Sequence, residues 1–114
     1  MSDCIFCRIA AKEIPAKVVY EDDRIIAFDD IRPQAPVHTL IIPRTHLASL
    51  NEAGPERADL LGHILAKAPE IAEIKGVKAS GFRLVINTGP DSGQDVFHIH
   101  AHLLGGRKMQ WPPG

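Results

Sequence analysis

The chain has 114 residues, a formal net charge of -1 and 24% charged residues, which suits one globular domain with one core. Its 13 basic and 14 acidic residues leave no basic excess of the kind that indicates a nucleic-acid surface. No apolar run approaches the ~20 residues needed to span a bilayer, and the start of the chain lacks the pattern of a signal peptide. We therefore expect neither nucleic acid nor a membrane as a partner, and a cytoplasmic location.

The first half of the chain predicts a short helix and three strands. The helix covers residues 4–10, with Ser2 or Asp3 as its capping residue. Three apolar runs of β type follow, and the turn-like residues between the first two indicate a hairpin. These runs cover residues 18–20, 25–28 and 37–43.

The second half predicts a long helix and two more strands. Apolar residues recur with helical period from about 55 to 75, and Pro69 inside this pattern should kink or split the helix. His63 lies in the same pattern, and we interpret it as a surface or partly buried histidine without a catalytic role. Residues 82–87 predict a fourth strand, and the alternating residues around 98–103 predict a fifth.

Three histidines alternate with apolar residues in that last strand. Residues two apart in a strand share a face and lie about 6.6 Å apart. His98, His100 and His102 should therefore form a row, which makes them candidates for an active site or a metal site. The loop 88–94 before the row contains glycines whose backbone amides can approach a phosphate, although most such stretches are plain turns.

With this row of histidines, the sequence resembles the histidine triad (HIT) superfamily, whose signature is His-x-His-x-His followed by apolar residues. It looks closest to the Hint branch of nucleotide-binding phosphoramidate hydrolases, and the likeness covers nearly the whole chain. Besides the histidines, the segments that carry it are 3–6, 12–17, 21–24, 30–31, 33–38, 105–107 and 111–114.

The resemblance implies a single domain over residues 1–114, of α+β class. Its expected parts are a five-stranded, mainly antiparallel sheet, one long helix and a short N-terminal helix. The resemblance also implies a homodimer whose sheets join across the interface. The C-terminal tail, residues 107–114, would then lie at the interface, and Trp111 would reach toward the active site of the partner.

The resemblance assigns His100 as a nucleophile that attacks phosphorus. The resulting nucleotidyl-histidine splits one difficult displacement into two easier ones. His38 and His102 would supply donors or positive charge to the nonbridging phosphoryl oxygens. The implied activity is hydrolysis of the P–N bond in a purine nucleoside phosphoramidate, which releases an AMP- or GMP-like nucleotide and an amine. No cofactor is required for this chemistry.

The same resemblance assigns the contacts to the nucleotide. Asn87 and backbone amides around Gly93 match the phosphate side, and Asp30 matches a residue that accepts hydrogen bonds from the ribose hydroxyls. Without the family, Asp30 would be interpreted as a loop carboxylate in an acidic run. The residues that match the apolar purine pocket are Ile5, Phe6, Ile9, Phe28 and Ile31.

Asp95 departs from the family pattern. Many Hint-like sequences place a serine at this position, two residues after Gly93 and near the leaving group. A carboxylate that faces a phosphate repels it unless it is protonated or turned away. Asp95 is therefore left outside the catalytic set, and the group that protonates the leaving amine stays open.

Cys4 and Cys7 have the spacing of zinc ligands, although two ligands do not make a site. Packing beneath the sheet is one alternative, and a redox pair is another that lacks the strand expected before it. Some HIT-related proteins close a zinc site with two such cysteines and two histidines. By this resemblance His46 and His98 would complete a structural zinc site with Cys4 and Cys7.

Three other functions stay open. One is hydrolysis of dinucleoside polyphosphates, as in another HIT branch, which the ending 111–114 disfavours. Another is a nucleotide-binding module with little turnover. The last is a catalytic metal site at the histidine row, because His-x-His on a strand can bind zinc.

Overall fold

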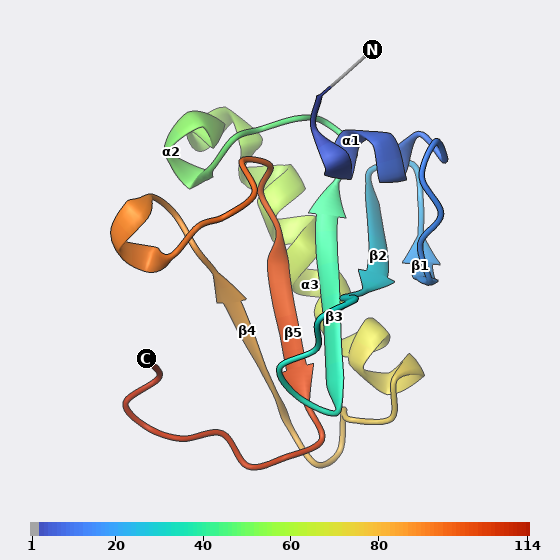
Figure 1. Ribbon diagram of the computed structural model, residues 1–114, viewed down its shortest axis with the longest axis vertical. Helices are drawn as coiled ribbons and strands as arrows, with labels where there is room; N and C mark the ends of the chain where they lie inside the picture. Colours follow the sequence, from blue (N-terminus) through green and yellow to red (C-terminus); the bar gives the residue numbers. More distant parts are fainter. Residues whose placement is uncertain (1–2) are drawn as a thin grey trace.

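The computed structural model describes residues 3–114 and contains a five-stranded sheet with helical segments on both of its faces (Figure 1). The strands cross the sheet in the order β1-β2-β3-β5-β4, and all neighbouring pairs are antiparallel. The strands are β1 (Val18–Glu21), β2 (Ile25–Asp29), β3 (Val37–Pro43), β4 (Phe82–Ile86) and β5 (Ala101–Gly105). This architecture confirms the predicted α+β class and the predicted hairpin.

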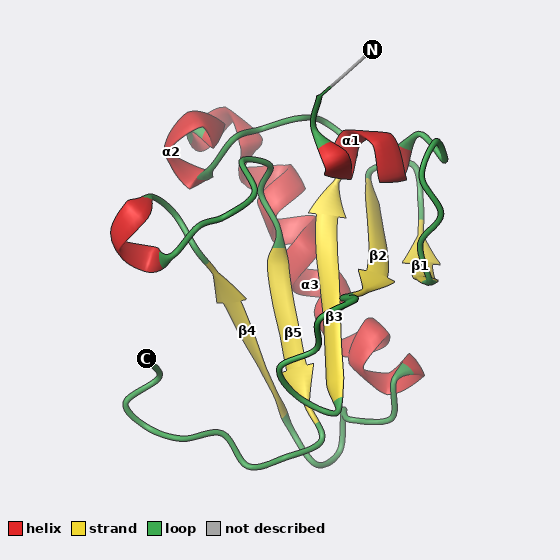
Figure 2. Cartoon of the chain, in the orientation of Figure 1, coloured by secondary structure: helices red, strands yellow, loops and turns green. Residues whose placement is uncertain are grey.

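One long helix and several short helical segments accompany the sheet (Figure 2). They are α1 (Ile5–Ala10), α2 (Leu50–Ala53), η1 (Pro55–Arg57), α3 (Ala58–Ile74) and η2 (Pro90–Ser92). In Figure 1 the long helix α3 lies behind the sheet, and α1 lies in front of it at one end. Within residues 3–114, no helix is both long enough and apolar enough to cross a membrane.

The two faces of the sheet carry separate apolar clusters. The cluster that packs against α3 includes Ile25, Ala27, Ile41, Ile64, Ile71, Ala101 and Leu103. The smaller cluster, on the side of α1, comprises Phe6, Ile9, Ile26, Phe28, Leu40 and Ile42. Because His102 pairs with Leu40 across β3 and β5, and paired residues share a face, the His102 side chain lies on the α1 face.

The start of α1 differs from the prediction. Cys4 caps the helix, since its extended backbone leads into the first turn and its Sγ accepts a hydrogen bond from the N–H of Cys7 at 3.4 Å. Asp3 is therefore not the cap, and Ser2 lies outside the described residues. The capping thiol places Cys4 and Cys7 on one turn, with both sulfurs on the same side.

The predicted split of the helix at Pro69 is wrong, because α3 runs unbroken from Ala58 to Ile74. Proline removes one backbone hydrogen bond, but Ala68, Ile71 and Ala72 on either side are buried against the sheet. Their packing outweighs the local preference of proline. The helix also begins one turn later than predicted, after the short segment η1.

The histidine strand is shorter than predicted. β5 begins at Ala101, so His98 and His100 precede it. The ladders to β3 and β4 both end at Ala101, and the N–H of Ile99 donates instead to the carbonyl of Leu47 at 2.7 Å. The three residues 98–100 are nevertheless almost fully buried, so the chain continues inside the molecule beyond the end of the sheet.

Candidate functional site

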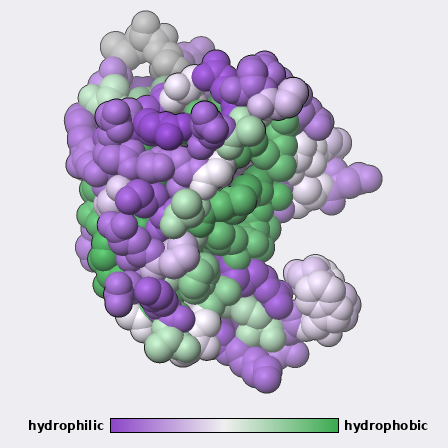
Figure 3. All heavy atoms as spheres, turned by 180° about the vertical axis from the view of Figure 1, so that it is seen from behind, coloured by the Kyte–Doolittle hydropathy of each residue, from purple (hydrophilic) through white to green (hydrophobic). Residues whose placement is uncertain are grey.

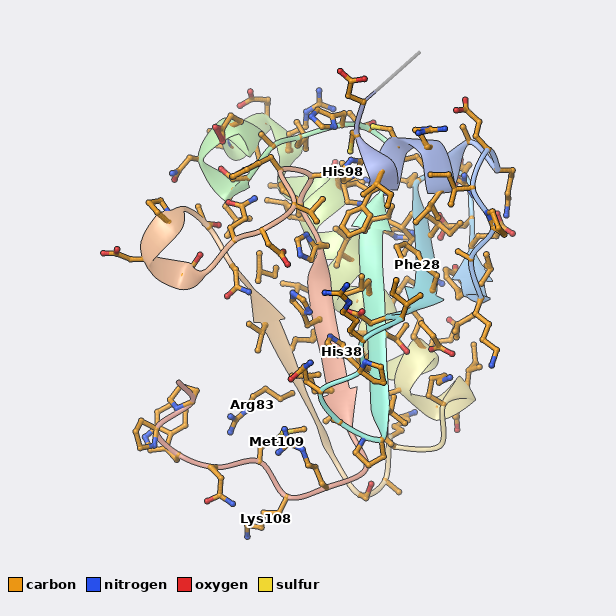
Figure 4. The ribbon with its side chains drawn as sticks, in the orientation of Figure 1. Phe28, His38, Arg83, His98, Lys108 and Met109 are labelled. Carbon is orange, nitrogen blue, oxygen red and sulfur yellow. The ribbon has the colours of Figure 1, made fainter. Side chains whose placement is uncertain are left out.

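A cavity of about 460 Å³ opens on the α1 face of the sheet. Its apolar wall includes all five residues predicted for a purine pocket, namely Ile5, Phe6, Ile9, Phe28 and Ile31. The rings of Phe6 and Phe28 meet edge to face, with 5.6 Å between their centroids, and Figure 4 shows Phe28 at this position on β2. His100 and His102 line the same cavity, so an apolar surface and reactive imidazoles share one space.

Several lining residues were not predicted. The additional ones are Ile14, Pro15, Ala16, Lys17, Asp29, Arg32, Leu40, Asp95 and Val96. Strand alternation would have indicated Leu40, which lies two residues after His38 and on the same face. The segment 14–17 has no periodic pattern. It joins the cavity because the N–H of Asp29 donates to the carbonyl of Lys17 at 3.1 Å, which holds the segment beside β2.

The imidazole of His100 is oriented by the backbone carbonyl of His98, two residues earlier. Its Nδ1 lies 2.8 Å from the carbonyl oxygen of His98, and a carbonyl only accepts. Nδ1–H is therefore the donor, and Nε2 of the neutral ring carries a free lone pair. The residue is only 3% exposed, and its ring packs edge-on against Phe6 and His102 with centroids 5.1 Å and 4.8 Å away.

A chain of hydrogen bonds sets the protons of the other two histidines. The N–H of Gln34 donates to Nδ1 of His38 at 3.0 Å, so the neutral ring keeps its proton on Nε2. That Nε2–H faces Nδ1 of His102 at 2.9 Å, so His102 accepts there and carries its proton on Nε2. Among the residues described, the buried Nε2 of His102 has no hydrogen-bond partner. It is therefore an available N–H donor next to His100.

Burial favours the neutral form of His38, His98 and His102. It lowers the pKa of His102 to about 4, with the neighbouring His100 and His38 acting in the same direction. Burial also lowers the pKa of His38 and of His98. Asp30 opposes this effect, because its Oδ2 lies 3.4 Å from Nε2 of His38. Near neutral pH the hydrogen bonds therefore act on uncharged rings with defined tautomers.

Of the other predicted nucleotide contacts, one lines the cavity and two do not. Asp30 is part of its lining, and its Oδ1 accepts the N–H of Arg32 at 2.9 Å. Asn87 directly follows β4, and the pairing of Val85 with His102 places Asn87 on the histidine face. Asn87 is not among the lining residues, and neither is Gly93 or His38.

Gly93 ends η2 with a φ of 83°, which is a left-handed conformation that favours glycine. A Cβ at this position would meet no atom within 4 Å. The glycine is therefore explained by its backbone conformation, and the space beside it stays open.

Cys4, Cys7, His46 and His98 converge at the α1 end of the sheet, and their ligand atoms all lie within 4.8 Å of one another. Nδ1 of His98 is 3.3 Å from Sγ of Cys4 and 3.5 Å from Sγ of Cys7. Nδ1 of His46 is 3.3 Å from Sγ of Cys7 and 3.2 Å from Nδ1 of His98. Figure 4 shows His98 at this end, away from His38.

The geometry of this cluster fits a tetrahedral zinc ion. Zn–N bonds of about 2.0 Å and Zn–S bonds of about 2.3 Å place ligand atoms roughly 3.3 to 3.8 Å apart, close to the observed separations. Nε2 of His98 donates to the carbonyl of Pro43 at 2.8 Å, so the lone pair on Nδ1 faces the other ligands. Two thiolates and two imidazoles form a donor set that zinc prefers.

A second group of possible ligands consists of Asp30, His38 and His102. Here the geometry favours a hydrogen-bonded chain over a metal site. The N–H of Gln34 fixes a proton on Nε2 of His38, which is the nitrogen that faces His102. A protonated nitrogen has no lone pair for a metal.

Residues 11–109 match the family model of the HIT domain. The chain is 52% identical over 114 residues to the "14 kDa zinc-binding protein" of Brassica juncea, covering 98% of this chain and 100% of that protein. It is 51% identical over 115 residues to "Adenylylsulfatase HINT1" of Arabidopsis thaliana, covering 99% and 78%. The crystal structure of a HIT family hydrolase from Legionella pneumophila Philadelphia 1 matches with a TM-score of 0.95 and 54% identity, covering 98% of this chain and 100% of that chain. The chain therefore belongs to the HIT domain family.

Proposed function

We propose that the protein hydrolyses the P–N bond of purine nucleoside phosphoramidates, with His100 as the nucleophile. The observation that carries the proposal is the orientation of this ring. Its Nδ1–H is held by the carbonyl of His98 at 2.8 Å, which leaves the lone pair of Nε2 available in a cavity with an apolar wall. The names of two relatives support a hydrolase, since one is called a HIT family hydrolase and the other an adenylylsulfatase.

In the proposed first step, the lone pair of Nε2 attacks phosphorus and forms a P–N bond to His100. The bond from phosphorus to the leaving nitrogen breaks, and that nitrogen gains a proton and departs as an amine. Water then attacks the same phosphorus and gives up a proton, while the electron pair of the P–N bond returns to Nε2. The products are a nucleoside monophosphate and an amine.

The two other histidines have different roles in this proposal. The unpartnered Nε2–H of His102 donates to a nonbridging phosphoryl oxygen, where charge develops. His38 is a positioning residue, because its own Nε2–H is already given to His102. The family resemblance had implied a phosphate contact for both histidines. Asn87 and the amides around Gly93 would complete the phosphate side.

The nucleoside would occupy the apolar end of the cavity. The rings of Phe6 and Phe28 offer a wall against which a flat purine packs, and ligand pockets of this kind are mostly apolar with a few polar groups. Asp30 lines the same cavity and would accept hydrogen bonds from the ribose hydroxyls.

Replacement of His100 tests the proposal. His100→Ala should lower kcat/KM for adenosine phosphoramidate by about a thousandfold or more, while the Kd for AMP changes by less than about threefold. His63→Gln, on the far side of the sheet, is the matched control and should retain activity. Mass spectrometry of the wild-type protein mixed with a slow substrate should find one mononucleotide on the peptide that contains His100.

Two results would overturn the assignment of His100 as the nucleophile. One is hydrolysis by His100→Ala at the wild-type rate, and the other is an adduct on a different residue. Tight AMP binding by a wild-type protein that does not hydrolyse any phosphoramidate would instead support a binding module.

The name of the Arabidopsis relative supports a second candidate substrate, adenylyl sulfate. The same attack by His100 on phosphorus would release sulfate in place of an amine. Comparison of kcat/KM for adenylyl sulfate and adenosine phosphoramidate on one enzyme preparation decides between them, and we expect the phosphoramidate to have the higher value.

We also propose that Cys4, Cys7, His46 and His98 hold a structural zinc ion. The tetrahedral fit of their ligand atoms supports it, and so does the name of the Brassica relative. When bound, zinc would neutralise the two thiolates and join α1 to the ends of β3 and β5. None of the four side chains takes part in the proposed reaction.

We further propose a homodimer that forms along β4. This strand is an edge of the sheet and is half-buried at every position. Figure 3 shows hydrophobic side chains on the back of the molecule toward β4 and the C-terminal tail. In the tail, Trp111 is 81% exposed and its ring lies 5.9 Å from the guanidinium of Arg83. Sedimentation equilibrium should give twice the mass of one chain, and a monomer would contradict this assembly.

The cytoplasmic location inferred from the sequence stays a prediction.

A further inference from the structure

We propose that Asp95 selects substrates by the charge of their leaving group. Its carboxylate would favour phosphoramidates of amines that carry a second, positively charged group and would disfavour anionic leaving groups. The inference rests on the proposed reaction at His100 and names the class of substrate that this site prefers.

Asp95 lies on the exposed side of the cavity that also contains His100 and His102, and its own side chain is exposed. The nucleoside would fill the apolar end of the cavity, and the phosphorus would lie at His100. In this arrangement the leaving group would point toward the exposed side of the cavity, on which Asp95 is located.

The loop that carries Asp95 is held in place by Gln94. The side-chain carbonyl of Gln94 accepts the N–H of Gly89 at 2.9 Å. Its amide nitrogen donates to the carbonyls of Ala48 at 2.8 Å and Val96 at 3.2 Å. The backbone on both sides of Asp95 is therefore fixed, so the carboxylate stays near the cavity.

The charge of Asp95 is not neutralised by a neighbour. Among residues 3–114, Asp95 forms no hydrogen bond or ion pair. Its charge reaches the nearby imidazole, since burial lowers the pKa of His102 while the carboxylate of Asp95 acts in the opposite direction.

The other two carboxylates of the cavity each face a basic side chain. The carboxylate of Asp29 lies 2.9 Å from Nζ of Lys75, and that of Asp30 faces His38 at 3.4 Å. Lys17 and Arg32 also line the cavity, but they belong to the segments before β1 and after β2, which would surround the nucleoside in the proposed complex. At the phosphate end, Asp95 therefore sets the sign of the charge that a leaving group meets.

The expected effect is moderate, because the carboxylate is exposed. A single charge pair near a protein surface changes an equilibrium or a rate by roughly fivefold, and dissolved salt screens it. A cationic leaving group should gain this factor and an anionic one should lose it. Sulfate and polyphosphate leaving groups belong to the disfavoured class.

Three adenosine phosphoramidates of similar shape provide the test. They are made with trimethylenediamine, which leaves a distal ammonium group, with butylamine, which is neutral, and with β-alanine, which leaves a distal carboxylate. For the wild-type enzyme we expect kcat/KM to fall in this order, by roughly fivefold at each step at low salt. High salt should compress the series.

The variants isolate the charge of Asp95. Asp95→Asn should bring the three substrates together, and Asp95→Glu should retain the order. Asp91→Asn removes an exposed carboxylate from η2 of the same loop, outside the cavity lining, and should leave the series unchanged. The ratio between two substrates on one preparation does not depend on the fraction of enzyme that is folded.

The outcomes separate this inference from the proposed function. Hydrolysis of all three substrates at equal kcat/KM by the wild-type enzyme would overturn the role of Asp95 and leave the His100 reaction intact. The same holds if Asp95→Asn keeps the wild-type order. Absence of hydrolysis even of the butylamine compound would overturn the proposed function itself.

Discussion

Backbone groups, rather than charged side chains, set the proton positions of His38 and His100 and, through His38, that of His102. The carbonyl of His98 fixes the proton of His100, and the N–H of Gln34 fixes that of His38. The proton of His102 then follows from its bond to His38. Because burial lowers the pKa of His38 and of His102, the hydrogen bond between these two rings keeps its direction near neutral pH.

The neutral state of His102 predicts a loss of stability in acid. The pKa of its imidazole is about 4 in the folded protein, compared with an ordinary value of 6.5. Between these values the unfolded chain binds more protons, so the free energy of unfolding falls as the pH drops from 6.5 toward 4. His102→Gln removes this titration and should make the fall less steep. Urea unfolding at stepped pH measures both slopes.

The comparison with wild type isolates His102. Acid also protonates the zinc ligands proposed above, but this contribution is common to both proteins and cancels in the difference. Equal slopes for His102→Gln and wild type would show that burial does not depress the basicity of this imidazole.

The sequence identified eight of the seventeen residues that line the cavity, but not the order of the hydrogen bonds among the histidines. Resemblance and alternation were sufficient for His100, His102 and the apolar wall, because these depend on residue type and spacing. The acceptor role of His38 depends on a backbone N–H four residues earlier, in a loop without a regular pattern. Only the folded loop places the N–H of Gln34 on that ring.

Among the elements, the β1–β2 turn and α3 are joined by one carboxylate. The side chains of Tyr20 and His63 both donate to Oδ2 of Asp22, at 2.8 Å and 2.7 Å. The N–H groups of Arg24 and Ile25 donate to its Oδ1 at 2.8 Å and 2.9 Å. Burial acts to raise the pKa of Asp22, but these hydrogen bonds outweigh it and hold the pKa well below its usual range.

This link predicts a measurable coupling between hairpin and helix. Asp22→Asn should lower the free energy of unfolding by about 1–3 kcal/mol, because charge-assisted hydrogen bonds are lost. Asp23→Asn, at the exposed neighbouring position, should change it by less than about 0.5 kcal/mol. In a double-mutant cycle with His63→Ala, we expect a coupling energy of about 1 kcal/mol between Asp22 and His63. Additive effects would mean that the two side chains act independently.

For His63, the sequence predicted the position in a helix but not the hydrogen-bond partner. Its place on α3 and its partial burial follow the expectation, and its partner could not be predicted because the turn that carries Asp22 is distant in sequence. The continuity of α3 through Pro69 and the late start of β5 were missed for a related reason. Both depend on packing against other elements, which local residue preferences do not contain.

At the scale of the whole molecule, the proposed zinc site joins segments from both ends of the chain. Cys4 and Cys7 come from α1, His46 follows β3, and His98 precedes β5. A ligand that binds only the folded state stabilises it by about 4 kcal/mol when its free concentration is a thousand times its Kd. Removal of zinc should therefore lower the melting temperature, which calorimetry before and after chelation measures.

The cysteine variant supplies the control for this experiment. Cys7→Ser should abolish the response of the melting temperature to zinc, while His63→Gln, a histidine outside the cluster, should retain it. Protein purified without chelators should contain one zinc per chain. A zinc-free preparation that melts at the same temperature with and without added metal would refute the site.

His98 belongs to both sites through different atoms. Its ring faces the cysteines, and its carbonyl oxygen holds the ring of His100. A small rotation of this one peptide plane would tilt His100, the proposed nucleophile, away from its line of attack while the sheet remained intact. Damage to the cluster should therefore impair turnover earlier than it impairs folding, and the activity of a stored sample would report the integrity of the proposed zinc site, whose four residues lie outside the cavity lining.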